Sequence, residues 1–292
     1  MIRPRRSMLY MPASNARALE KARTLPVDGI IIDLEDAVAP DAKQEARARV
    51  VETLKQGGFG EREVIVRINA LDTPWGNDDL VALAHSAFDG ILLPKVSDAA
   101  ILERVGTRLL DLHVGLHVRV WAMMETMFAV LRAPEIAALA KDSETRLAGF
   151  VLGTNDLVKE SNARIVPGRA PLAPWLMQCV AAARAYGLVI LDGVYNGIGD
   201  ADGFRAECEQ GRDMGFDGKT LIHPSQVEPC NAVFSPDPAE VAEARQIIAA
   251  FDRPENKDKG VLQIDGRMVE RMHADIARRT VAIADAISER GA

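Results

Sequence analysis

Two carboxylates of the chain follow neighbouring apolar segments, a pattern that suits a metal ion. Glu125 follows the apolar run in WAMMET, and Asp156 follows the next run in GFVLGTNDL. If these runs are adjacent parallel strands, both side chains reach the same end of the sheet. Carboxylate oxygens with open water positions suit Mg²⁺, so we predict Glu125 and Asp156 as magnesium ligands. The alternative is a pair of solvated or salt-bridged loop acids.

An arginine in a third apolar run is a candidate for binding an anionic substrate. Arg67 and Asn69 are two residues apart in VIVRIN and therefore point to the same side of a strand. The planar guanidinium of Arg67 matches a carboxylate or a 2-oxo acid. The alternative is a structural salt bridge from Arg67 to Asp33 or Glu35.

Three further acids follow the run GIIIDL. In LEDAV, Asp33 and Glu35 fall on one face and Asp36 on the other if the strand continues. All three therefore cannot bind one ion directly, and we expect them to orient metal-bound water. Helix capping by Asp36 is the alternative.

Basic residues and histidines complete the candidate set. Arg3, Arg5, Arg6 and Lys43 offer positive charge for the phosphates of a nucleotide-like cofactor, and a solvated charged tail is the alternative. The H-x-x-x-H pair at residues 113 and 117 lacks the glutamate of a zinc-protease helix and is discounted. His223 ends the last apolar run and is either a residue of the site or a structural histidine.

Eight short apolar runs must position these side chains. They cover residues 7–11, 29–34, 64–68, 90–94, 119–123, 149–153, 188–192 and 219–223. The stretches between them have helical apolar spacing, and the runs recur about every 30 residues, as strand and crossover helix require. Polar residues follow nearly every run, and no G-x-G-x-x-G turn follows the first. The pattern favours an α/β fold of the (β/α)8 TIM-barrel type over an open doubly wound sheet.

The part of the chain after the eighth run predicts an appendage. We expect residues 1–235 to form the barrel and catalytic domain. Residues 236–292 are then a C-terminal helical extension, too short for a core of its own, that packs on its own barrel or on a neighbouring subunit. PAEVAEARQIIAAF predicts a helix, and VLQIDGRMVE predicts a strand-like piece that turns at Gly266 into a last helix from about Met268.

Composition argues against several classes of protein. The net charge is −7, from 35 basic and 42 acidic residues, which opposes nonspecific nucleic-acid binding. Three widely spaced cysteines form neither a disulfide framework nor a zinc site and fit a reducing cytoplasm. No run approaches the roughly 18 apolar residues of a membrane span, and the start of the chain lacks a signal-peptide core. We expect a cytoplasmic protein without membrane or nucleic-acid partners.

Seven motifs, taken in order, resemble a known family. RSMLYMP, DGIIIDLEDAV, RINA, LLPKV, METM, GTNDL and DGKTLIHPSQ are similar to the citrate lyase β-subunit-like group of CoA-ester lyases, which includes the malyl-CoA lyases, in the HpcH/HpaI aldolase superfamily. The resemblance implies a magnesium-dependent barrel enzyme, usually a homotrimer or homohexamer, that makes or breaks a carbon–carbon bond between an acyl-CoA and a 2-oxo acid. The residues at the family's functional positions are Glu125 and Asp156 for the metal, Arg67 for the oxo acid, Arg5 and Arg6 for CoA, and Asn155 and Pro224 for the substrate pocket.

One position departs from the lyases of this group. They carry an aspartate after Met-Ile or Met-Val, supplied across a subunit interface as an acid/base group, whereas GRMVERMH places Glu270 there. Together with WAMMET, LDGVYNG and AECEQGRDMGFDGKTLIHPSQ, this glutamate resembles the (3S)-malyl-CoA thioesterase branch. The resemblance thus implies thioester hydrolysis or carbon–carbon cleavage of esters such as malyl-CoA, with Glu270 as a catalytic group. The alternative is a catalytically weak subunit that binds CoA or an acyl carrier within a larger lyase assembly.

Overall fold

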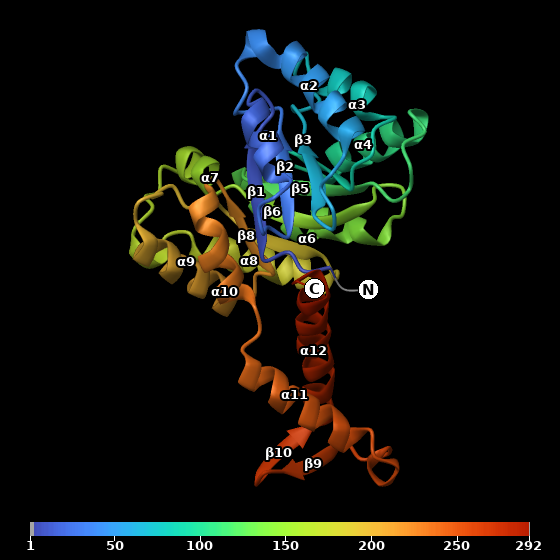
Figure 1. Ribbon diagram of the computed structural model, residues 1–292, viewed down its shortest axis with the longest axis vertical. Coiled ribbons are helices and arrows are strands. Elements are labelled where there is room, and N and C mark those ends of the chain that lie inside the picture. Colours follow the sequence, from blue (N-terminus) through green and yellow to red (C-terminus); the bar gives the residue numbers. More distant parts are fainter. Residues whose placement is uncertain (1–2, 292) are drawn as a thin grey trace. The chain divides into compact units, whose positions relative to one another are not determined.

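Eight parallel strands close into a barrel in the computed structural model, which describes residues 3–291 (Figure 1). The strands are β1 (Ser7–Pro12), β2 (Gly29–Asp33), β3 (Glu63–Arg67), β4 (Gly90–Leu93), β5 (Arg119–Met124), β6 (Leu147–Leu152), β7 (Val189–Asp192) and β8 (Gly218–Leu221). Each pairs with the next, and β8 pairs with β1 in the register Ser7↔Lys219. The predicted TIM barrel is confirmed, and each of the eight apolar runs contributes a strand.

The strands are buried on both faces, which explains their continuous apolar runs. Alternate residues fill the barrel interior, namely Met8, Ile31, Ile65, Leu92, Trp121, Met123, Val151 and Leu191. Residues between them, such as Ile30 and Ile32 of β2, are fully buried as well. The interior is therefore a packed core rather than a channel.

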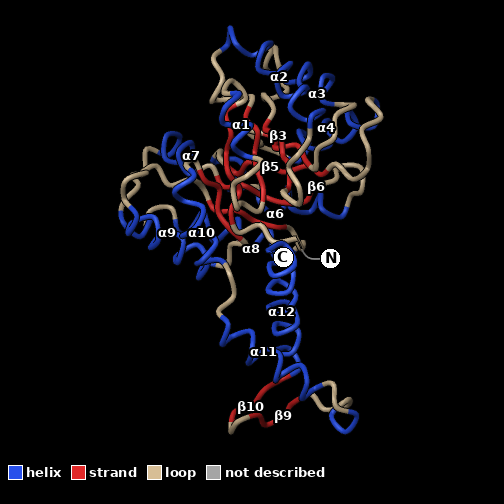
Figure 2. Tube along the Cα trace, viewed as in Figure 1, coloured by secondary structure: helices blue, strands red, loops and turns tan. Residues whose placement is uncertain are grey.

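Helices surround the strands (Figure 2). In the barrel unit they are α1 (Ala16–Ala22), α2 (Lys43–Gln56), α3 (Gly76–Leu83), α4 (Ala99–Asp111), α5 (Met127–Leu131), α6 (Ala133–Ala138), α7 (Thr154–Ser161), α8 (Ala173–Ala185) and α9 (Ala201–Met214), followed by α10 (Val227–Phe234). Short 3₁₀ turns are η1 (Pro40–Ala42), η2 (Leu139–Lys141), η3 (Pro167–Arg169), η4 (Pro224–Gln226) and η5 (Pro254–Asn256). Within residues 3–291, no helix is long and apolar enough to cross a membrane.

The inward alternation of the core continues to the carboxyl ends of the strands. Asp33 lies two residues after the core residue Ile31, and Arg67 lies two residues after Ile65. Because side chains alternate along a strand, both point to the barrel axis above the apolar layer. The alternation that directs apolar side chains into the core therefore also directs Asp33 and Arg67 toward the axis at the carboxyl end of the barrel.

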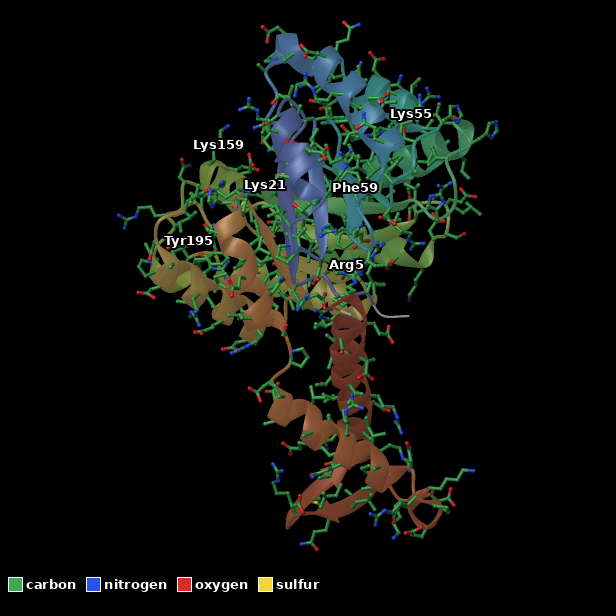
Figure 3. All side chains as sticks on the ribbon, viewed as in Figure 1. Arg5, Lys21, Lys55, Phe59, Lys159 and Tyr195 are labelled. Carbon is green, nitrogen blue, oxygen red and sulfur yellow. The ribbon has the colours of Figure 1, made fainter. Side chains whose placement is uncertain are left out.

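Arg5 and Arg6 directly precede β1 and so lie at the amino-terminal end of the barrel, where Figure 3 labels Arg5. The Nη2 atom of Arg5 donates to Oε1 of Glu63, the first residue of β3, at 2.9 Å. The Nη2 atom of Arg6 donates to Oδ1 of Asp28, just before β2, at 2.8 Å. The assignment of Arg5 and Arg6 to CoA binding stays a prediction, and both guanidinium groups are paired in the protein without ligand. Residues that precede a strand lie at its amino end, and both guanidinium groups pair with carboxylates there.

The chain divides into two compact units, residues 5–231 with the barrel, and residues 232–291 together with residues 3 and 4. The second unit contains α11 (Pro238–Phe251), β9 (Val261–Ile264), β10 (Arg267–Glu270) and α12 (Arg271–Gly291). Phe251, Val269 and Ala274 form its small apolar cluster. The last helix begins at Arg271 rather than near Met268, because residues 267–270 form a second strand paired antiparallel with β9.

Candidate active site

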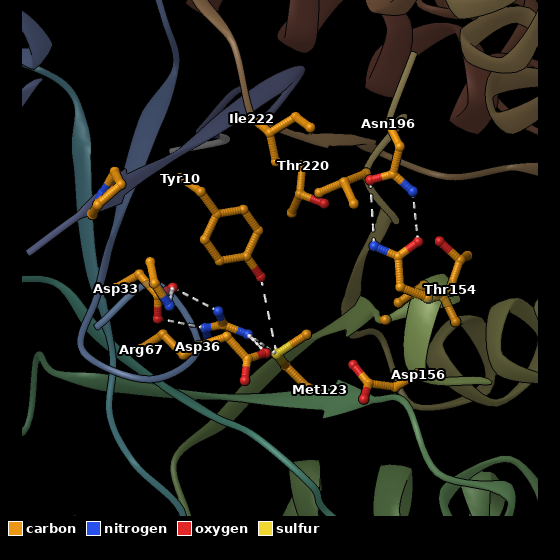
Figure 4. Close-up of a pocket in the computed structure, with 16 residues that line it drawn as sticks. Tyr10, Asp33, Asp36, Arg67, Met123, Thr154, Asp156, Asn196, Thr220 and Ile222 are labelled. Carbon is orange, nitrogen blue, oxygen red and sulfur yellow. Dashed lines mark hydrogen bonds and ion pairs between the residues drawn. The ribbon is translucent and has the colours of Figure 1, made fainter. Parts of the chain in front are cut away.

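A cavity of about 370 Å³ lies at the carboxyl ends of the barrel strands (Figure 4). Side chains and backbone from most strands line it: Tyr10, Pro12, Asp33, Asp36, Ala37, Arg67, Met123, Leu152, Gly153, Thr154, Asn155, Asp156, Val194, Asn196, Thr220 and Ile222. Five residues predicted for the site are among them, namely Asp33, Asp36, Arg67, Asn155 and Asp156. Active sites of TIM barrels form at this end, so the cavity is the candidate active site.

Arg67 lines the cavity while its guanidinium is paired with acids. Its Nε and Nη2 atoms donate to the two carboxylate oxygens of Asp33 at 2.7 and 2.6 Å. The remaining Nη1 atom lies 2.8 Å from Glu35 and 3.6 Å from Asp36. The ring of Tyr10 stacks 5.1 Å from the guanidinium carbon. The salt bridge from Arg67 to Asp33 or Glu35, which was the structural alternative, is thus present, and Arg67 lines the cavity as well. Asp33 orients the Arg67 guanidinium.

The loop after β2 is held by hydrogen bonds to its own backbone. Asp33 accepts from the amides of Glu35 and Ala37, at 2.9 and 3.1 Å. Lys43 donates from Nζ to the carbonyl oxygens of Leu34 and Glu35, at 2.8 and 2.7 Å. Lys43 therefore anchors this loop, and its expected role toward phosphates is corrected.

Glu35 carries an unusual carboxyl group in this loop. Burial raises its pKa from the ordinary 4.5 to about 7, opposed by Arg67 and reinforced by the charges of Asp36 and Glu125. Only 13% of its side chain is exposed. A carboxyl group with this pKa can carry or release a proton near neutral pH.

Asp36 does not cap a helix. The residues that precede η1 and α2 are Ala39 and Ala42, and neither turn has a side-chain cap. Asp36 instead lines the cavity, so the capping alternative is wrong. Asn69, two residues after Arg67, turns away from the cavity and bonds to Asp79 at 2.7 Å.

Glu125 is buried at the base of the site. It is 1% exposed and is not among the residues that line the cavity, and its Oε1 atom accepts a hydrogen bond from the backbone amide of Lys95 at 2.7 Å. Its Oε2 atom is buried without a hydrogen-bond partner. That oxygen lies against Gly153, where a Cβ atom would overlap the Glu125 side chain. Burial raises the pKa of Glu125, opposed by Lys95.

Asp156 lies in the first turn of α7 and lines the cavity. The ammonium of Lys95 joins the two predicted ligands, 2.7 Å from Oδ1 of Asp156 and 3.5 Å from Oε1 of Glu125. The structure therefore brings the carboxylates of Glu125 and Asp156 together around the ammonium of Lys95. Lys95 follows β4, and we assigned it no role from the sequence.

The residues at this position fit a hard divalent cation. An unpartnered, buried carboxylate oxygen of Glu125 beside a second carboxylate is the donor set that Mg²⁺ accepts. Among residues 3–291, no cluster of three or more His, Cys, Asp or Glu side chains is arranged as a metal site. Two side-chain ligands leave positions for water and substrate oxygens, which Mg²⁺ usually retains.

The rim of the cavity contains a reciprocal amide pair. Asn196 donates to Asn155 at 2.7 Å, and Asn155 donates back at 3.4 Å. Pro224 is not among the lining residues, since it begins η4, whereas Ile222 two residues earlier does line the cavity. The assignment of Pro224 to the substrate pocket therefore stays a prediction. His223 is exposed and bonds to Ser225, so it caps η4.

Tyr10 and Met123 are lining residues that sequence reasoning missed. The Tyr10 hydroxyl lies 3.9 Å from the sulfur of Met123, and the Nη1 atom of Arg67 lies 3.7 Å from the same sulfur. The signal was present, because Tyr10 follows the core residue Met8 by two positions. Burial raises the pKa of Tyr10, so its hydroxyl stays protonated.

Glu270 belongs to the second unit. It is the last residue of β10, paired with Val261, and its side chain is exposed. Its backbone amide donates to Nδ1 of His273 at 2.9 Å. The carboxylate is thus presented at the end of a hairpin immediately before α12.

A closed TIM barrel whose cavity at the carboxyl ends of the strands is lined by Arg67, Asp33, Asp36 and Asp156 defines the class of α/β-barrel enzymes. Residues 6–224 match the HpcH/HpaI aldolase/citrate lyase family. The chain belongs to this family, as the seven motifs predicted.

Individual relatives agree with this assignment. The chain is 53% identical over 285 residues to the (3S)-malyl-CoA thioesterase of Cereibacter sphaeroides, covering 98% of this chain and 96% of the relative. It is 33% identical to the citrate lyase subunit beta of Leuconostoc mesenteroides subsp. cremoris, covering 97% and 94%. The crystal structure of CitE from Mycobacterium tuberculosis in complex with magnesium, acetoacetate and coenzyme A matches with a TM-score of 0.74 and 30% identity, over 97% of this chain and 98% of that one. The prediction of an enzyme of the CoA-ester hydrolase and lyase type is confirmed.

Proposed function

We propose that this enzyme hydrolyses the thioester of a 3-hydroxy-dicarboxyl-CoA such as malyl-CoA, with Mg²⁺ as cofactor. The observation that carries the proposal is a single cavity that is lined by both Arg67 and Asp156. Glu125 is buried against Gly153, another lining residue. The 53% identity to a (3S)-malyl-CoA thioesterase supports this choice of substrate.

Glu125 and Asp156 are the residues that would hold Mg²⁺. When bound, the ion supplies Lewis-acid stabilisation of negative charge on substrate oxygens. The relative from Mycobacterium tuberculosis was solved with magnesium, which supports this cofactor.

Arg67 binds the free carboxylate of the substrate in this proposal. Asp33 occupies two of its donor nitrogens and fixes the plane of the guanidinium, which leaves Nη1 for the ligand. Glu35 and Asp36 surround Nη1 with negative charge that opposes an incoming anion. Protonation of Glu35, whose pKa is about 7, lowers this opposition near neutral pH.

Glu270 supplies the general base from a neighbouring subunit in this proposal. The second unit leaves three large apolar side chains mostly exposed, Met268, Met272 and Ile276 at 73%, 57% and 58%. We propose that they pack on a neighbouring copy in a homotrimer or homohexamer.

The chemical step follows from this arrangement. The Glu270 carboxylate takes a proton from a water molecule while the oxygen of that water attacks the thioester carbonyl carbon. The carbon–sulfur bond then breaks, and the sulfur leaves as the CoA thiol after protonation. The products are malate and free CoA.

Carbon–carbon cleavage is the second candidate, favoured by the 33% identity to citrate lyase β subunits. Here the base removes the proton of the C3 hydroxyl, the bond between C2 and C3 breaks, and the enolate of acetyl-CoA is reprotonated. Glyoxylate, held by Arg67, is the second product. The thioester survives, which separates this reaction from hydrolysis.

We also propose a cytoplasmic location. The three cysteines Cys179, Cys208 and Cys230 are free and buried, which fits a reducing compartment.

A panel of 3-hydroxyacyl-CoA esters tests the proposed function. We expect the purified enzyme to release thiol from malyl-CoA with added Mg²⁺, and to lose this activity after exhaustive chelation. Readdition of Mg²⁺ should restore it. Thiol release from none of the esters, or full activity after chelation, would contradict the proposal.

A further inference from the structure

Lys95 holds an unusual backbone conformation beside the two predicted metal ligands. It follows β4 and has a positive φ of 52°, in the left-handed region that few residues other than glycine and asparagine adopt. In this conformation its amide donates to Oε1 of Glu125 at 2.7 Å. The backbone amide of Lys95 therefore holds the Glu125 carboxylate independently of where the Lys95 side chain lies.

The side chain of Lys95 turns back onto the same site. Its ammonium lies 2.7 Å from Asp156 and 3.5 Å from Glu125. The two carboxylates otherwise bring two negative charges together, one of them almost fully buried. The ammonium is the positive charge in contact with both carboxylates, and Arg67 adds a weaker favourable charge at Glu125.

We propose that Lys95 is the internal counter-cation of this site, whose ammonium occupies the carboxylate pair in the metal-free protein, leaves Asp156 when Mg²⁺ binds, and so sets the affinity for Mg²⁺. This inference rests on the metal site of the proposed function. Lys95 is a positioning residue here, because it acts on the cation and not on the substrate.

The geometry allows such an exchange without unfolding. The Lys95 side chain is 38% exposed, so its ammonium can move into solvent. Glu125 keeps its position meanwhile, because the Lys95 amide and the contact with Gly153 hold it. A cation that stays within 4 Å of both carboxylates repels an incoming Mg²⁺, whereas one that leaves exposes both carboxylates to it.

Two substitutions remove the ammonium while keeping the backbone. Lys95→Asn replaces lysine by a residue that tolerates the left-handed conformation, and Lys95→Met keeps the length of the side chain. Lys159→Met is the matched control, because Lys159 is exposed on α7, the helix that carries Asp156 (Figure 3). Each variant loses one positive charge.

Calorimetric titration of metal-free protein with MgCl2, without substrate, measures the affinity directly. We expect Lys95→Asn and Lys95→Met to bind Mg²⁺ about tenfold more tightly than the native protein or more, and Lys159→Met to match it within about twofold. The metal-free Lys95 variants should also melt at lower temperature, and saturating Mg²⁺ should remove that difference. Unchanged or weaker Mg²⁺ binding in both Lys95 variants would overturn the inference.

A measurement on the native protein avoids variants that fail to fold. Acetylation of lysines by a water-soluble ester, followed by peptide mass spectrometry, reports how free each ammonium is. We expect Mg²⁺ to accelerate modification of Lys95 severalfold and to leave Lys159 unchanged; equal rates at Lys95 with and without Mg²⁺ would overturn the inference. A native protein that binds no Mg²⁺ would overturn the proposed metal site as well, whereas the outcomes at Lys95 alone leave the proposed function standing.

Discussion

Arg67 is held by Asp33 through two parallel hydrogen bonds and covered by the ring of Tyr10. An ammonium cannot form this two-point contact, nor can it present a third nitrogen in the same plane. We expect Arg67→Lys to lower kcat/KM for malyl-CoA by about 100-fold or more. Thiol-release kinetics measure the loss, and circular dichroism checks that the fold is intact. Native turnover in the lysine variant would reassign Arg67 to structure alone.

Glu35 predicts a pH dependence of stability in the metal-free protein. Its pKa is about 7 when folded and ordinarily 4.5, so the folded state binds its proton more tightly. The stability contributed by the protonated group is complete below pH 4.5 and is lost as pH rises through about 7.

The comparison is between the native protein and Glu35→Gln, unfolded by urea in the presence of a chelator. The native protein should lose about 2 to 3 kcal/mol relative to the variant between about pH 5 and about pH 8. A difference in unfolding free energy that stays constant over this range would show that the pKa of Glu35 is not raised.

Single residues show where sequence reasoning succeeds. Arg67 and Asp156 were predictable because residues after a barrel strand meet at one end, and the structure places both at the cavity. Arg5 and Arg6 were assigned to CoA by charge and by resemblance, and the sequence did not show that they would pair with Glu63 and Asp28, respectively. The contacts of Lys95 depend on its positive φ, which a sequence does not display.

Loops after β5 and β6 meet at Gly153, where the absence of a side chain makes room for Glu125. A Cβ atom there would overlap the Glu125 side chain, so Gly153→Ala must displace it or strain α7. We expect a lower melting temperature and Mg²⁺ binding weakened about tenfold or more. Gly260→Ala is the control, since no atom lies within 4 Å of its added Cβ. Native melting temperature and native Mg²⁺ affinity in both variants would show that Gly153 does not support the metal site.

Elements were predictable where burial makes the pattern strong. The eight barrel strands are apolar on both faces, and each coincides with a predicted run. The hairpin of β9 and β10 was missed, although Asp265 and Gly266 both adopt the positive φ that a two-residue hairpin turn requires. Its flanking strands are mostly exposed, so their apolar pattern is weak.

The proposed role of Glu270 as general base depends on assembly of the protein into oligomers. If Glu270 acts in the cavity of a neighbouring subunit, one chain can supply the barrel and another the carboxylate. Glu270→Gln and Glu125→Gln should each be inactive alone. Co-expressed as mixed oligomers in equal amounts, they should regain activity at about a quarter of the sites.

A different affinity tag on each variant, with purification on both tags in turn, confirms that the mixed oligomers form. Mixed assemblies that remain as inactive as either variant would show that Glu270 acts within its own chain or not at all. The sequence could indicate this residue by resemblance, but the surface proposed for subunit contact consists of exposed apolar side chains of the second unit, which only a structure reveals.

The fate of the thioester tests the central claim most directly. Malyl-CoA incubated with the native enzyme and Mg²⁺ is assayed in parallel for free CoA thiol and for glyoxylate. Hydrolysis predicts one thiol for each malyl-CoA consumed, accompanied by malate, with glyoxylate a minor product. Stoichiometric glyoxylate and acetyl-CoA without free thiol would contradict hydrolysis and assign the enzyme to carbon–carbon cleavage.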